Sequence, residues 1–340
     1  MDLTDDHKVI REGVEAVCNR FGDDYWLARD SDGVFPEDFH RAMAEAGWLG
    51  ITMPEEYGGA GLGVSEAAVM MNTVARAGAM AAASSIHINM FGPHPILVFG
   101  SEAQKQAWIP RLVQGLDKVS FGVTEPNVGL DTTNITTFAE KVDGGYIVNG
   151  RKIWNSTAQV ASRIMLLART EKRDENTKPT AGMSIFYTEF DRSKIEVQII
   201  DKMGRKAVDS NMVFFDDYFI PDGDLIGEAG KGFQYILHSI NPERILVGAE
   251  GVGIGQDALR RASAYALERE VFGRPIGQNQ AIQHPLAENW MELEAASLMV
   301  MRAADLYDRQ QDCAAQANAA KFLGGRAGYN AALQAVMTHG

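Results

Sequence analysis

Cysteine is nearly absent from this 340-residue sequence, and its histidines form no metal-binding pattern. Cys18 and Cys313 are far apart and belong to no C-x-x-C spacing, so neither a disulfide framework nor a structural zinc site has support. The seven histidines include no H-E-x-x-H or similar pair. We therefore expect two reduced core thiols and no bound metal.

Long hydrophobic runs and targeting signals are also missing. No apolar run reaches the roughly 18 residues that a membrane-spanning helix needs. The first ten residues, MDLTDDHKVI, are acidic, and they lack both the basic and apolar regions of a signal peptide and the arginine content of a transit peptide. The sequence therefore predicts a cytoplasmic protein without a membrane span.

Positive charge is scarce as well. Lys and Arg number 32 against 45 Asp and Glu, which gives a net charge of −13. Nucleic-acid binding depends on clustered Lys and Arg, so a nucleic-acid partner is excluded. The remaining composition, with 46% hydrophobic and 23% charged residues, is typical of a globular protein. The length predicts about two to three domains.

Helical patterns dominate up to about residue 116. The stretch PEDFHRAMAEAGWLG has apolar residues near helical spacing, and SEAAVMMNTVARAGAMAAAS begins with Ser65 and Glu66, which are typical of a helix start. Between them, the glycines of PEEYGGAGLG permit a tight loop. No Gly-Lys-Ser/Thr follows, which argues against a phosphate-binding P-loop. We predict an N-terminal helical domain over residues 1–118.

Short strands are predicted from about residue 119 to 227. In KVDGGYIVNGRKIW, a Gly-Gly turn and an Asn-Gly turn flank a short strand, Tyr146–Val148. The runs RIMLLART, GMSIFYTEF, IEVQII and NMVFFDDYFI are apolar or alternating and are separated by polar turns. The polar stretch Thr170–Thr180 is predicted to be a solvated hairpin tip. These features predict a middle antiparallel β domain over residues 119–227.

Helical periodicity returns in the last part of the chain, residues 228–340. Its long segments are Ile245–Glu268, Gln278–Gln310 and Ala314–Thr338, and the short links between them predict a helical bundle. GVGIG, Gly251–Gly255, has no strand before it, so we expect its glycines to permit close helix packing and not to bind a dinucleotide. The predicted fold class is α+β, with helical, antiparallel β and helical domains in that order.

Three motifs and their order resemble the acyl-CoA dehydrogenase family. They are FGVTEPNVGLDTT, NGRKIWNS and YALEREVFGRPIGQNQAIQ, and they follow one another with the family's spacing. The resemblance covers the whole chain. It implies a flavoprotein that holds FAD between the β domain and the C-terminal bundle, and it implies a homo-oligomer, either a dimer or a tetramer.

The resemblance also assigns individual residues to the flavin. Phe121, Val123 and Thr124 would line the isoalloxazine ring. Trp154 would cover the ring and Ser156 would donate a hydrogen bond near N5, since an aromatic plane supplies dispersion against a flat ring and hydroxyl groups orient it. For Trp154 the alternative is an ordinary aromatic residue of the β core. Residues matched to the rest of the flavin are Gly129, Leu130, Arg269, Phe272, Gln280, Met337 and Gly340.

Some of these residues would act across a subunit interface. Arg269, Phe272 and Gln280 match family residues that reach the adenosine and pyrophosphate of a neighbouring subunit's flavin. A guanidinium suits bidentate contact with phosphate. The alternative for Arg269 is a solvated helix residue.

The sequence departs from the family pattern at three places. Leu130 stands where relatives have a small hydroxyl residue, so backbone N–H groups must contact the flavin pyrophosphate there. Met337 stands where many relatives have a glutamine that faces the partner's flavin. The chain ends at Thr338–Gly340, where the family's His-Gly-Gly segment and last helices would begin. The resemblance therefore implies an incomplete C-terminal bundle, either a truncated piece or the ordered portion of a longer protein.

Glu243 is the candidate catalytic base. Acyl-CoA dehydrogenation requires a carboxylate near an apolar pocket, and in the isovaleryl-CoA and long-chain branches of the family it comes from an E-R pair like Glu243–Arg244. Arg244 would orient or balance the substrate site. The structural alternative is a helix start, with Asn241 as N-cap, Pro242 at the first helical position and Glu243 in the first turn.

The resemblance implies an acyl-CoA dehydrogenase that forms a trans-2-enoyl-CoA and passes electrons to an electron-transfer flavoprotein. An acyl-CoA oxidase or a flavin monooxygenase on the same fold is the enzymatic alternative. A catalytically silent module that binds flavin or acyl-CoA is the alternative from another class. The sequence does not define the acyl chain, whose pocket would depend on side chains such as those of Ser84–Gly92.

Overall fold

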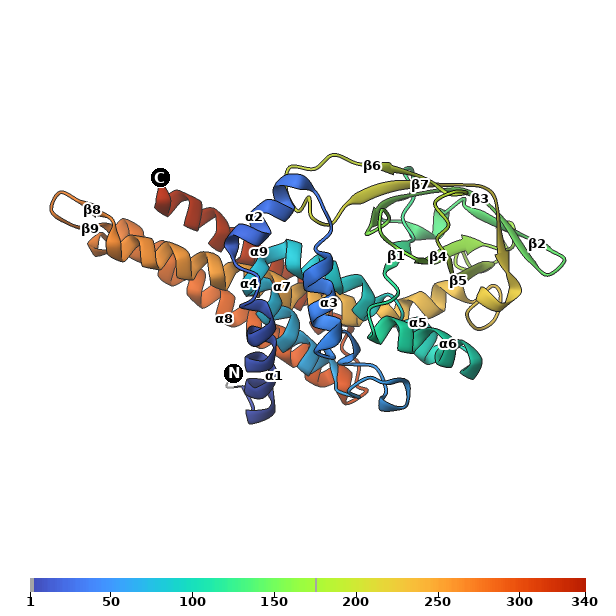
Figure 1. Cartoon of the computed structure of the whole chain (residues 1–340), viewed down its shortest axis with the longest axis horizontal. Coiled ribbons are helices and arrows are strands. Elements are labelled where there is room, and N and C mark those ends of the chain that lie inside the picture. The colour runs from blue at the N-terminus through green and yellow to red at the C-terminus, as the bar shows by residue number, and fades with distance from the viewer. Residues whose placement is uncertain (1–2, 175) are drawn as a thin grey trace. The chain divides into compact units, whose positions relative to one another are not determined.

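The computed structural model describes residues 3–174 and 176–340 (Figure 1). These residues form two compact units that cut across the order of the sequence. The first unit contains the N-terminal segment up to Trp26, Leu62–Ala83 and Asn241–Gly340, and the second contains Leu27–Gly61 and Ser84–Ile240. Because the units follow contacts and not sequence order, the predicted domain boundaries at 118 and 227 stay predictions.

Helices make up the part of the chain before residue 116, as predicted. They are α1 (Asp5–Cys18), α2 (Asp23–Asp32), α3 (Glu37–Glu45), α4 (Val64–Phe91), α5 (His94–Phe99) and α6 (Glu102–Val113), with short 3-10 turns η1 (Trp48–Gly50) and η2 (Glu55–Tyr57). The capping box that starts α6 pairs the hydroxyl of Ser101 with the backbone N–H of Gln104, and the Gln104 side chain accepts from the Ser101 N–H. Gly58 and Gly61 adopt positive φ values of 89° and 64°, which confirms the tight glycine loop.

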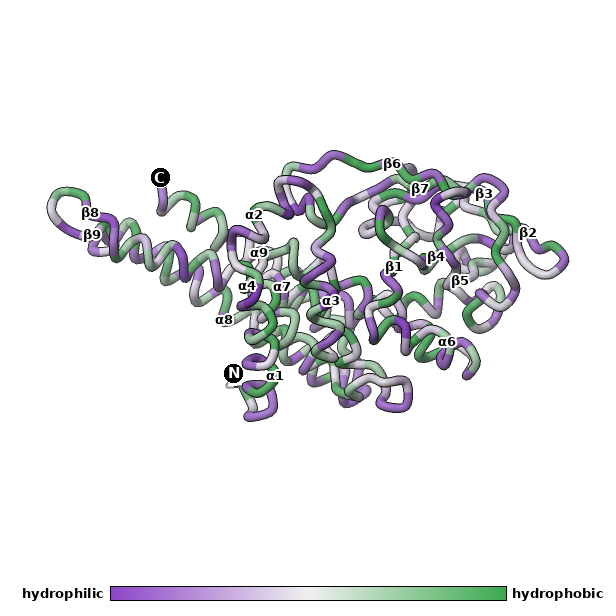
Figure 2. Tube along the Cα trace, in the orientation of Figure 1, coloured by the Kyte–Doolittle hydropathy of each residue, from purple (hydrophilic) through white to green (hydrophobic). Residues whose placement is uncertain are grey.

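The long helices after residue 230 confirm the predicted C-terminal helical part. They are α7 (Gly232–Glu268), α8 (Gln280–Asp308) and α9 (Ala314–His339), with the hairpin β8 (Glu270–Val271) and β9 (Arg274–Pro275) and the turn η5 (Ile276–Gln278) between α7 and α8. Figure 2 shows hydrophobic and hydrophilic stretches alternating along these helices. That alternation is typical of amphipathic helices that bury one face.

Glycines bring α7 and α9 into backbone contact. A Cβ atom on Gly251 would lie 2.6 Å from the carbonyl oxygen of Gly324, and one on Gly328 would lie 2.3 Å from the carbonyl oxygen of Gly251. A Cβ on Gly255 would lie 3.0 Å from the Cα of Gly328. The helix axes approach this closely only because these positions lack side chains. The packing interpretation of GVGIG is therefore confirmed.

The structural alternative for Glu243, a helix start at Asn241 and Pro242, is wrong. Helix α7 begins at Gly232, and Pro242 lies inside it. An interior proline loses one backbone hydrogen bond and costs about 3 kcal/mol. The helix continues because apolar residues on both sides of the proline are buried: Tyr235 and Ile236 before it, and Ile245 after it, are 6%, 2% and 0% exposed.

The second unit contains a seven-stranded sheet in the described residues, with the order β1-β4-β2-β3-β7-β6 and with β5 paired to β4. The strands are β1 (Val119–Gly122), β2 (Phe138–Val142), β3 (Gly145–Ser156), β4 (Arg163–Arg169), β5 (Met183–Glu189), β6 (Glu196–Ile199) and β7 (Ser210–Pro221), with turns η3 (Thr132–Asn134) and η4 (Asp222–Asp224). Most pairs are antiparallel, as predicted, but β1 and β2 both run parallel to β4. The runs predicted as strands correspond to β4, β5, β6 and β7.

The prediction of a short strand ending at an Asn-Gly turn is wrong. Strand β3 continues for 12 residues through Asn149 and Gly150 because β7, about sixty residues later, pairs along its whole length. A bulge at Asp217 on β7 faces Asn149, whose side chain exchanges hydrogen bonds of 2.8 and 2.9 Å with Asp217. The Gly-Gly turn is confirmed, since Val142 pairs with Gly145 in the β2–β3 hairpin.

The remaining sequence predictions concern loops, thiols and membrane helices. Strands β4 and β5 pair antiparallel, so Thr170–Thr180 connects a hairpin as predicted; position 175 of this loop lies outside the described residues. Cys18 and Cys313 are free and buried, which confirms the prediction of reduced core thiols. In the described ranges, no helix is both long and apolar enough to cross a membrane.

Candidate functional site

The segment assigned to the flavin ring, Phe121–Thr124, begins in the short strand β1 and continues past its end. The ring of Phe121 is half-buried and lies 5.3 Å from the ring of Phe91, centroid to centroid. Val123 and Thr124 are also half-buried. Main-chain carbonyl groups of all three residues accept hydrogen bonds from strand β3, so the backbone of this segment is fixed while its side chains stay partly accessible.

Trp154 stands out of the sheet at a β-bulge. In β3 the side chains of Tyr146, Val148 and Lys152 alternate onto the buried face, and regular alternation would bury Trp154 with them. A register shift between Ile153 and Asn155 places an extra residue there, so Asn155 is buried and Trp154 is 60% exposed with φ of +65°. The alternative of a β-core aromatic residue is therefore wrong for this side chain.

Ser156 ends β3 beside a guanidinium. Arg205 donates 3.0 Å to the hydroxyl of Ser210 and lies 3.4 Å from that of Ser156, a long contact. The Ser156 carbonyl accepts a hydrogen bond of 3.0 Å from the hydroxyl of Ser120. These contacts fix the end of the strand, and the Ser156 hydroxyl can donate its own proton to a ligand.

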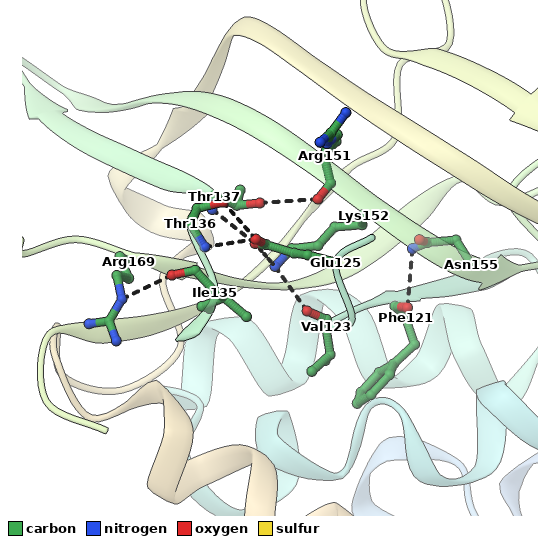
Figure 3. Close-up of polar contacts among 10 residues, drawn as sticks. All are labelled: Phe121, Val123, Glu125, Ile135, Thr136, Thr137, Arg151, Lys152, Asn155 and Arg169. Atoms are coloured by element: carbon green, nitrogen blue, oxygen red, sulfur yellow. Dashed lines mark hydrogen bonds and ion pairs between the residues drawn. The ribbon is translucent and has the colours of Figure 1, made fainter. Parts of the chain in front are cut away.

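A buried ion pair lies beside the segment Phe121–Thr124 (Figure 3). The ammonium of Lys152 is 2.9 Å from Oε1 of Glu125, and the two side chains are 0% and 4% exposed. Burial alone would raise the pKa of Glu125, but the charge of Lys152 and hydrogen bonds from Thr137 and Thr136 outweigh it and lower that pKa to about 2. Burial lowers the pKa of Lys152 to about 8, against the opposing effect of Glu125. Both groups are charged at neutral pH.

The loop that carries Gly129 and Leu130 is closed at its base by the same carboxylate. Oε2 of Glu125 accepts from the backbone N–H of Thr136 at 2.7 Å, and Oε1 accepts from the N–H of Thr137 at 2.9 Å. Gly129 and Leu130 are exposed, with Leu130 at 106%. The exposed backbone here is accessible to a ligand, as the flavin pyrophosphate would require.

Arg169 fixes the far side of this loop. Its guanidinium donates to the carbonyl oxygens of Ile135 at 3.1 Å and Thr133 at 2.7 Å, and also to those of Ala181 and Pro179, both at 3.0 Å. The residue is 5% exposed. Four carbonyl partners satisfy an otherwise costly buried cation and tie the loop to the β4–β5 hairpin.

Glu243 and Arg244 lie in the first unit, on α7. Glu243 is an interior helix residue, so the helix-start explanation for it no longer applies. Its side chain is 24% exposed, and its Oε1 is 3.6 Å from the ammonium of Lys321 on α9. Arg244 is half-buried, and Ile245 beside it is completely buried. A carboxylate therefore lies at the edge of an apolar helix contact.

The residues assigned to a neighbouring subunit are exposed, and they lie around the β8–β9 hairpin between the end of α7 and the start of α8 (Figure 1). Arg269 follows the last residue of α7, Phe272 is at the tip of the β8–β9 hairpin and Gln280 is the first residue of α8. Phe272 is 101% exposed with φ of +55°. Met337, on α9, is 67% exposed, and Gly340 follows that helix.

Sequence reasoning missed three buried polar residues that support this segment, Glu125, Lys152 and Asn155, and it missed the half-buried Arg205 beside Ser156. A signal for Lys152 was available, because even-numbered residues of β3 alternate onto the buried face and Lys152 is one of them. Its partner could not be found this way, since Glu125 lies on a separate loop. Asn155 could not be found either, because its burial depends on the bulge at Trp154.

The residues of the second unit fit the flavin that the sequence resemblance implies. A flat cofactor needs an accessible aromatic plane, and the bulge supplies one in Trp154. It also needs polar groups at its edge, which Thr124 and Ser156 can provide, and accessible backbone near its phosphates, as at Gly129. In the described ranges, no group of three or more His, Cys, Asp or Glu side chains could hold a metal ion.

Comparison with known proteins gives consistent matches along the whole chain. Family models described as the acyl-CoA dehydrogenase N-terminal, middle and C-terminal domains match residues 4–116, 120–218 and 230–340. The probable acyl-CoA dehydrogenase YngJ of Bacillus subtilis is 33% identical over all of this chain and 89% of its own length.

Solved structures match equally completely. The structure of butyryl-CoA dehydrogenase from Megasphaera elsdenii superposes with a TM-score of 0.93 at 28% identity, covering all of this chain and 89% of that one. An FAD complex of PigA superposes with a TM-score of 0.93 at 26% identity, covering all of this chain and 88% of that one.

Proposed function

Because the chain belongs to the acyl-CoA dehydrogenase family of FAD-dependent oxidoreductases, we propose that it converts an acyl-CoA to a trans-2-enoyl-CoA with Glu243 as the base. Acyl-CoA dehydrogenation and the use of FAD follow from the family itself. The base, the product and the electron acceptor are the parts that we propose here.

The observation that carries the proposal is the position of Glu243 within α7. A carboxylate at a helix start has a structural reason to be there, but Glu243 lies in the helix interior after Pro242. Among the residues that the structure describes, its ion-pair partner is Lys321 at 3.6 Å, whose side chain is 48% exposed. Such pairs contribute at most about 1 kcal/mol. A chemical role therefore explains this half-buried carboxylate better than a structural one.

In the proposed reaction, the carboxylate of Glu243 removes the proton from the α carbon beside the thioester. The electron pair of that C–H bond forms the α,β double bond as the β hydrogen leaves with its own electron pair. FAD, when bound, supplies the acceptor for this hydride at N5. Arg244 orients the substrate or balances the charge of the site. Trp154 and Ser156 position the ring, the first by dispersion and the second by a hydrogen bond.

The test is anaerobic stopped-flow bleaching of the flavin by acyl-CoA in Glu243→Gln. Glutamine keeps the size of the side chain but cannot take a proton, so flavin reduction should slow by roughly 10²–10⁴-fold. Two controls separate charge from chemistry. Glu268→Gln changes an exposed glutamate of the same helix, and Lys321→Met removes the ion pair while leaving the carboxylate. Both should bleach nearly as fast as the wild type. Near-normal bleaching in Glu243→Gln would assign the base elsewhere.

We further propose an electron-transfer flavoprotein as the acceptor. Support comes from the family, whose dehydrogenases pass electrons to such a carrier. An oxidase on the same fold would consume oxygen and release peroxide during acyl-CoA turnover without any carrier. Oxygen uptake at the rate of flavin reduction would therefore favour the oxidase. Acyl-CoAs of graded length and branching, compared by bleaching rate, would identify the substrate.

A further inference from the structure

The burial of Lys152 requires an explanation beyond stability. Its ammonium is completely buried in the second unit, where removal of a charge from water is costly. A buried ion pair is a weak source of stability, because apolar residues of the same volume often replace such pairs without loss. Methionine at this position of β3 would fill a similar volume without the cost of burying a charge. The lysine must therefore supply something that an apolar side chain cannot.

What the lysine supplies is a hydrogen-bond donor to the flavin-facing segment (Figure 3). Lys152 donates to the carbonyl oxygen of Val123 at 3.0 Å. The amide of Asn155 donates to the carbonyl of Phe121 at 3.1 Å, and the backbone N–H of Ile153 donates to that of Thr124 at 2.9 Å. Three donors from β3, at Lys152, Ile153 and Asn155, thus fix three peptide planes in the segment that would line the flavin ring.

The partner of the lysine fixes a second segment. Glu125 accepts from Lys152 and from the backbone N–H groups of Thr136 and Thr137, and it also accepts from the Thr136 hydroxyl at 2.8 Å. Thr136 and Thr137 follow the loop that carries Gly129, where the flavin pyrophosphate is expected. One carboxylate therefore joins the ring-facing segment, the phosphate-facing loop and β3.

We propose that Glu125 and Lys152 are positioning residues for the flavin: together they hold the ring-facing segment Phe121–Thr124 and the loop at Gly129 in one fixed arrangement. This inference rests on the proposed function, because it presumes that both segments contact the flavin. Neither residue touches the cofactor. Each acts through the backbone that it holds.

The first test is the rate at which FAD leaves the holoenzyme after dilution, followed by the recovery of flavin fluorescence. Lys152→Met removes the donor to Val123 and leaves Glu125 with an unpaired charge. Release should become at least about tenfold faster. The visible absorption and circular dichroism of the flavin that remains bound should also change, since the ring-facing carbonyl groups are free to turn. A purely structural role would lower the melting temperature without changing either flavin signal.

The matched control is another buried carboxylate of the same unit. Asp117 is 1% exposed and accepts from Arg111 at 2.8 and 3.0 Å and from Ser162 at 2.8 Å. Asp117→Asn disrupts an ion pair whose carboxylate is buried and whose Arg111 side chain is 49% exposed, without changing the contacts of Val123 or Glu125. It should lower the melting temperature while the rate of FAD release and the flavin spectrum stay at wild-type values. Equal acceleration of release in both variants would overturn the proposal.

The double variant Glu125→Gln with Lys152→Met keeps the test usable if the single change prevents folding. It removes both charges, so no unpaired ion is left buried. The proposal requires faster FAD release in this variant too, because Val123 still lacks its donor and the glutamine amide cannot accept as the carboxylate did. A folded double variant that holds FAD like the wild type would overturn it.

Hydrogen exchange in the wild-type holoenzyme tests the same point without any substitution. The amide protons of Thr136 and Thr137 should exchange slowly, and rising urea should expose them at the concentration where FAD is released. If FAD left while these amides remained protected, the Glu125–Lys152 pair would not control the retention of FAD, and the proposal would be overturned. A wild-type protein that holds no FAD would instead overturn the proposed function. A wild-type protein that binds FAD, with variants that release it at the wild-type rate, would overturn only this inference.

Discussion

Substitution of Trp154 separates an effect on FAD binding from an effect on folding stability, because a β-bulge exposes its indole. Truncating a buried tryptophan costs about 3–5 kcal/mol. Trp154 is 60% exposed, so less than half of its side chain contributes to the core, and Trp154→Ala should cost about 1–2 kcal/mol. The left-handed backbone at φ of +65° is about 1 kcal/mol less favourable for a non-glycine residue than for glycine. Trp154→Gly should therefore be about 1 kcal/mol more stable than Trp154→Ala on this account.

Trp154→Ala should weaken flavin binding directly, in addition to its modest effect on the fold. Stacking of an aromatic plane contributes about 0.5–1.5 kcal/mol beyond buried area, so loss of the indole should weaken FAD binding several-fold and alter the visible spectrum. Urea unfolding of the FAD-free protein measures the first effect, and titration with FAD under fluorescence detection measures the second. Separate measurement matters because bound FAD itself raises the apparent stability.

Trp108 is the matched control for this experiment. It belongs to the same unit, is 7% exposed and lies 5.0 Å from the ring of Tyr187. Trp108→Ala should lose about 3–5 kcal/mol, and whatever protein stays folded should bind FAD normally. The reasoning about the bulge would be refuted if Trp154→Ala lost as much stability as Trp108→Ala while its flavin spectrum and affinity stayed unchanged.

Three further predictions follow from the structure. The folded-state pKa of Glu125 is lowered to about 2, so its contribution to stability should be present above the ordinary carboxyl pKa and be lost as pH falls toward 2. Urea unfolding at stepped pH measures this loss. The free energy of unfolding should decline less with falling pH in Glu125→Gln than in the wild type. Gly251→Ala should destabilise by about 1–3 kcal/mol in thermal unfolding, because its Cβ would lie 2.6 Å from the Gly324 carbonyl oxygen. The Cβ of Gly325→Ala would have no atom of the described residues within 4 Å, so this substitution should be neutral or stabilising. Arg269→Ala should lower both flavin content and oligomer mass in light scattering while monomer stability is unchanged, since the residue is exposed; wild-type values for both would remove Arg269 from the interface.

The order of helical, β and helical parts could be predicted from the sequence because it depends on periodicities within short segments. Amphipathic repeats gave α7, α8 and α9, and apolar runs gave β4 and β5. The glycines of Gly251–Gly255 were correctly assigned to helix packing, because a residue without a side chain inside a helix has few other uses. The family motifs also come from the sequence alone, since their residue types and spacing do not depend on what lies nearby in space.

Local turn and helix-start signals predicted the wrong structure where contacts with distant residues determine the backbone conformation. Asn149 and Gly150 form a strong local turn signal, yet pairing with β7 keeps them in a strand. Pro242 is a good first helical residue, yet burial on both sides of it holds α7 together across the proline. In both cases the energy of long-range packing exceeds a local preference of a few kcal/mol.

The candidate site shows the same division. Sequence motifs identified Trp154 and Glu243 by residue type, but only the tertiary structure decided that the bulge exposes the first and that the second lies inside a helix. The Glu125–Lys152 pair joins residues 27 positions apart, and no periodicity relates them. A buried charge is tolerated only where its partners are already in place, so its role is determined by the assembled fold and not by any one segment.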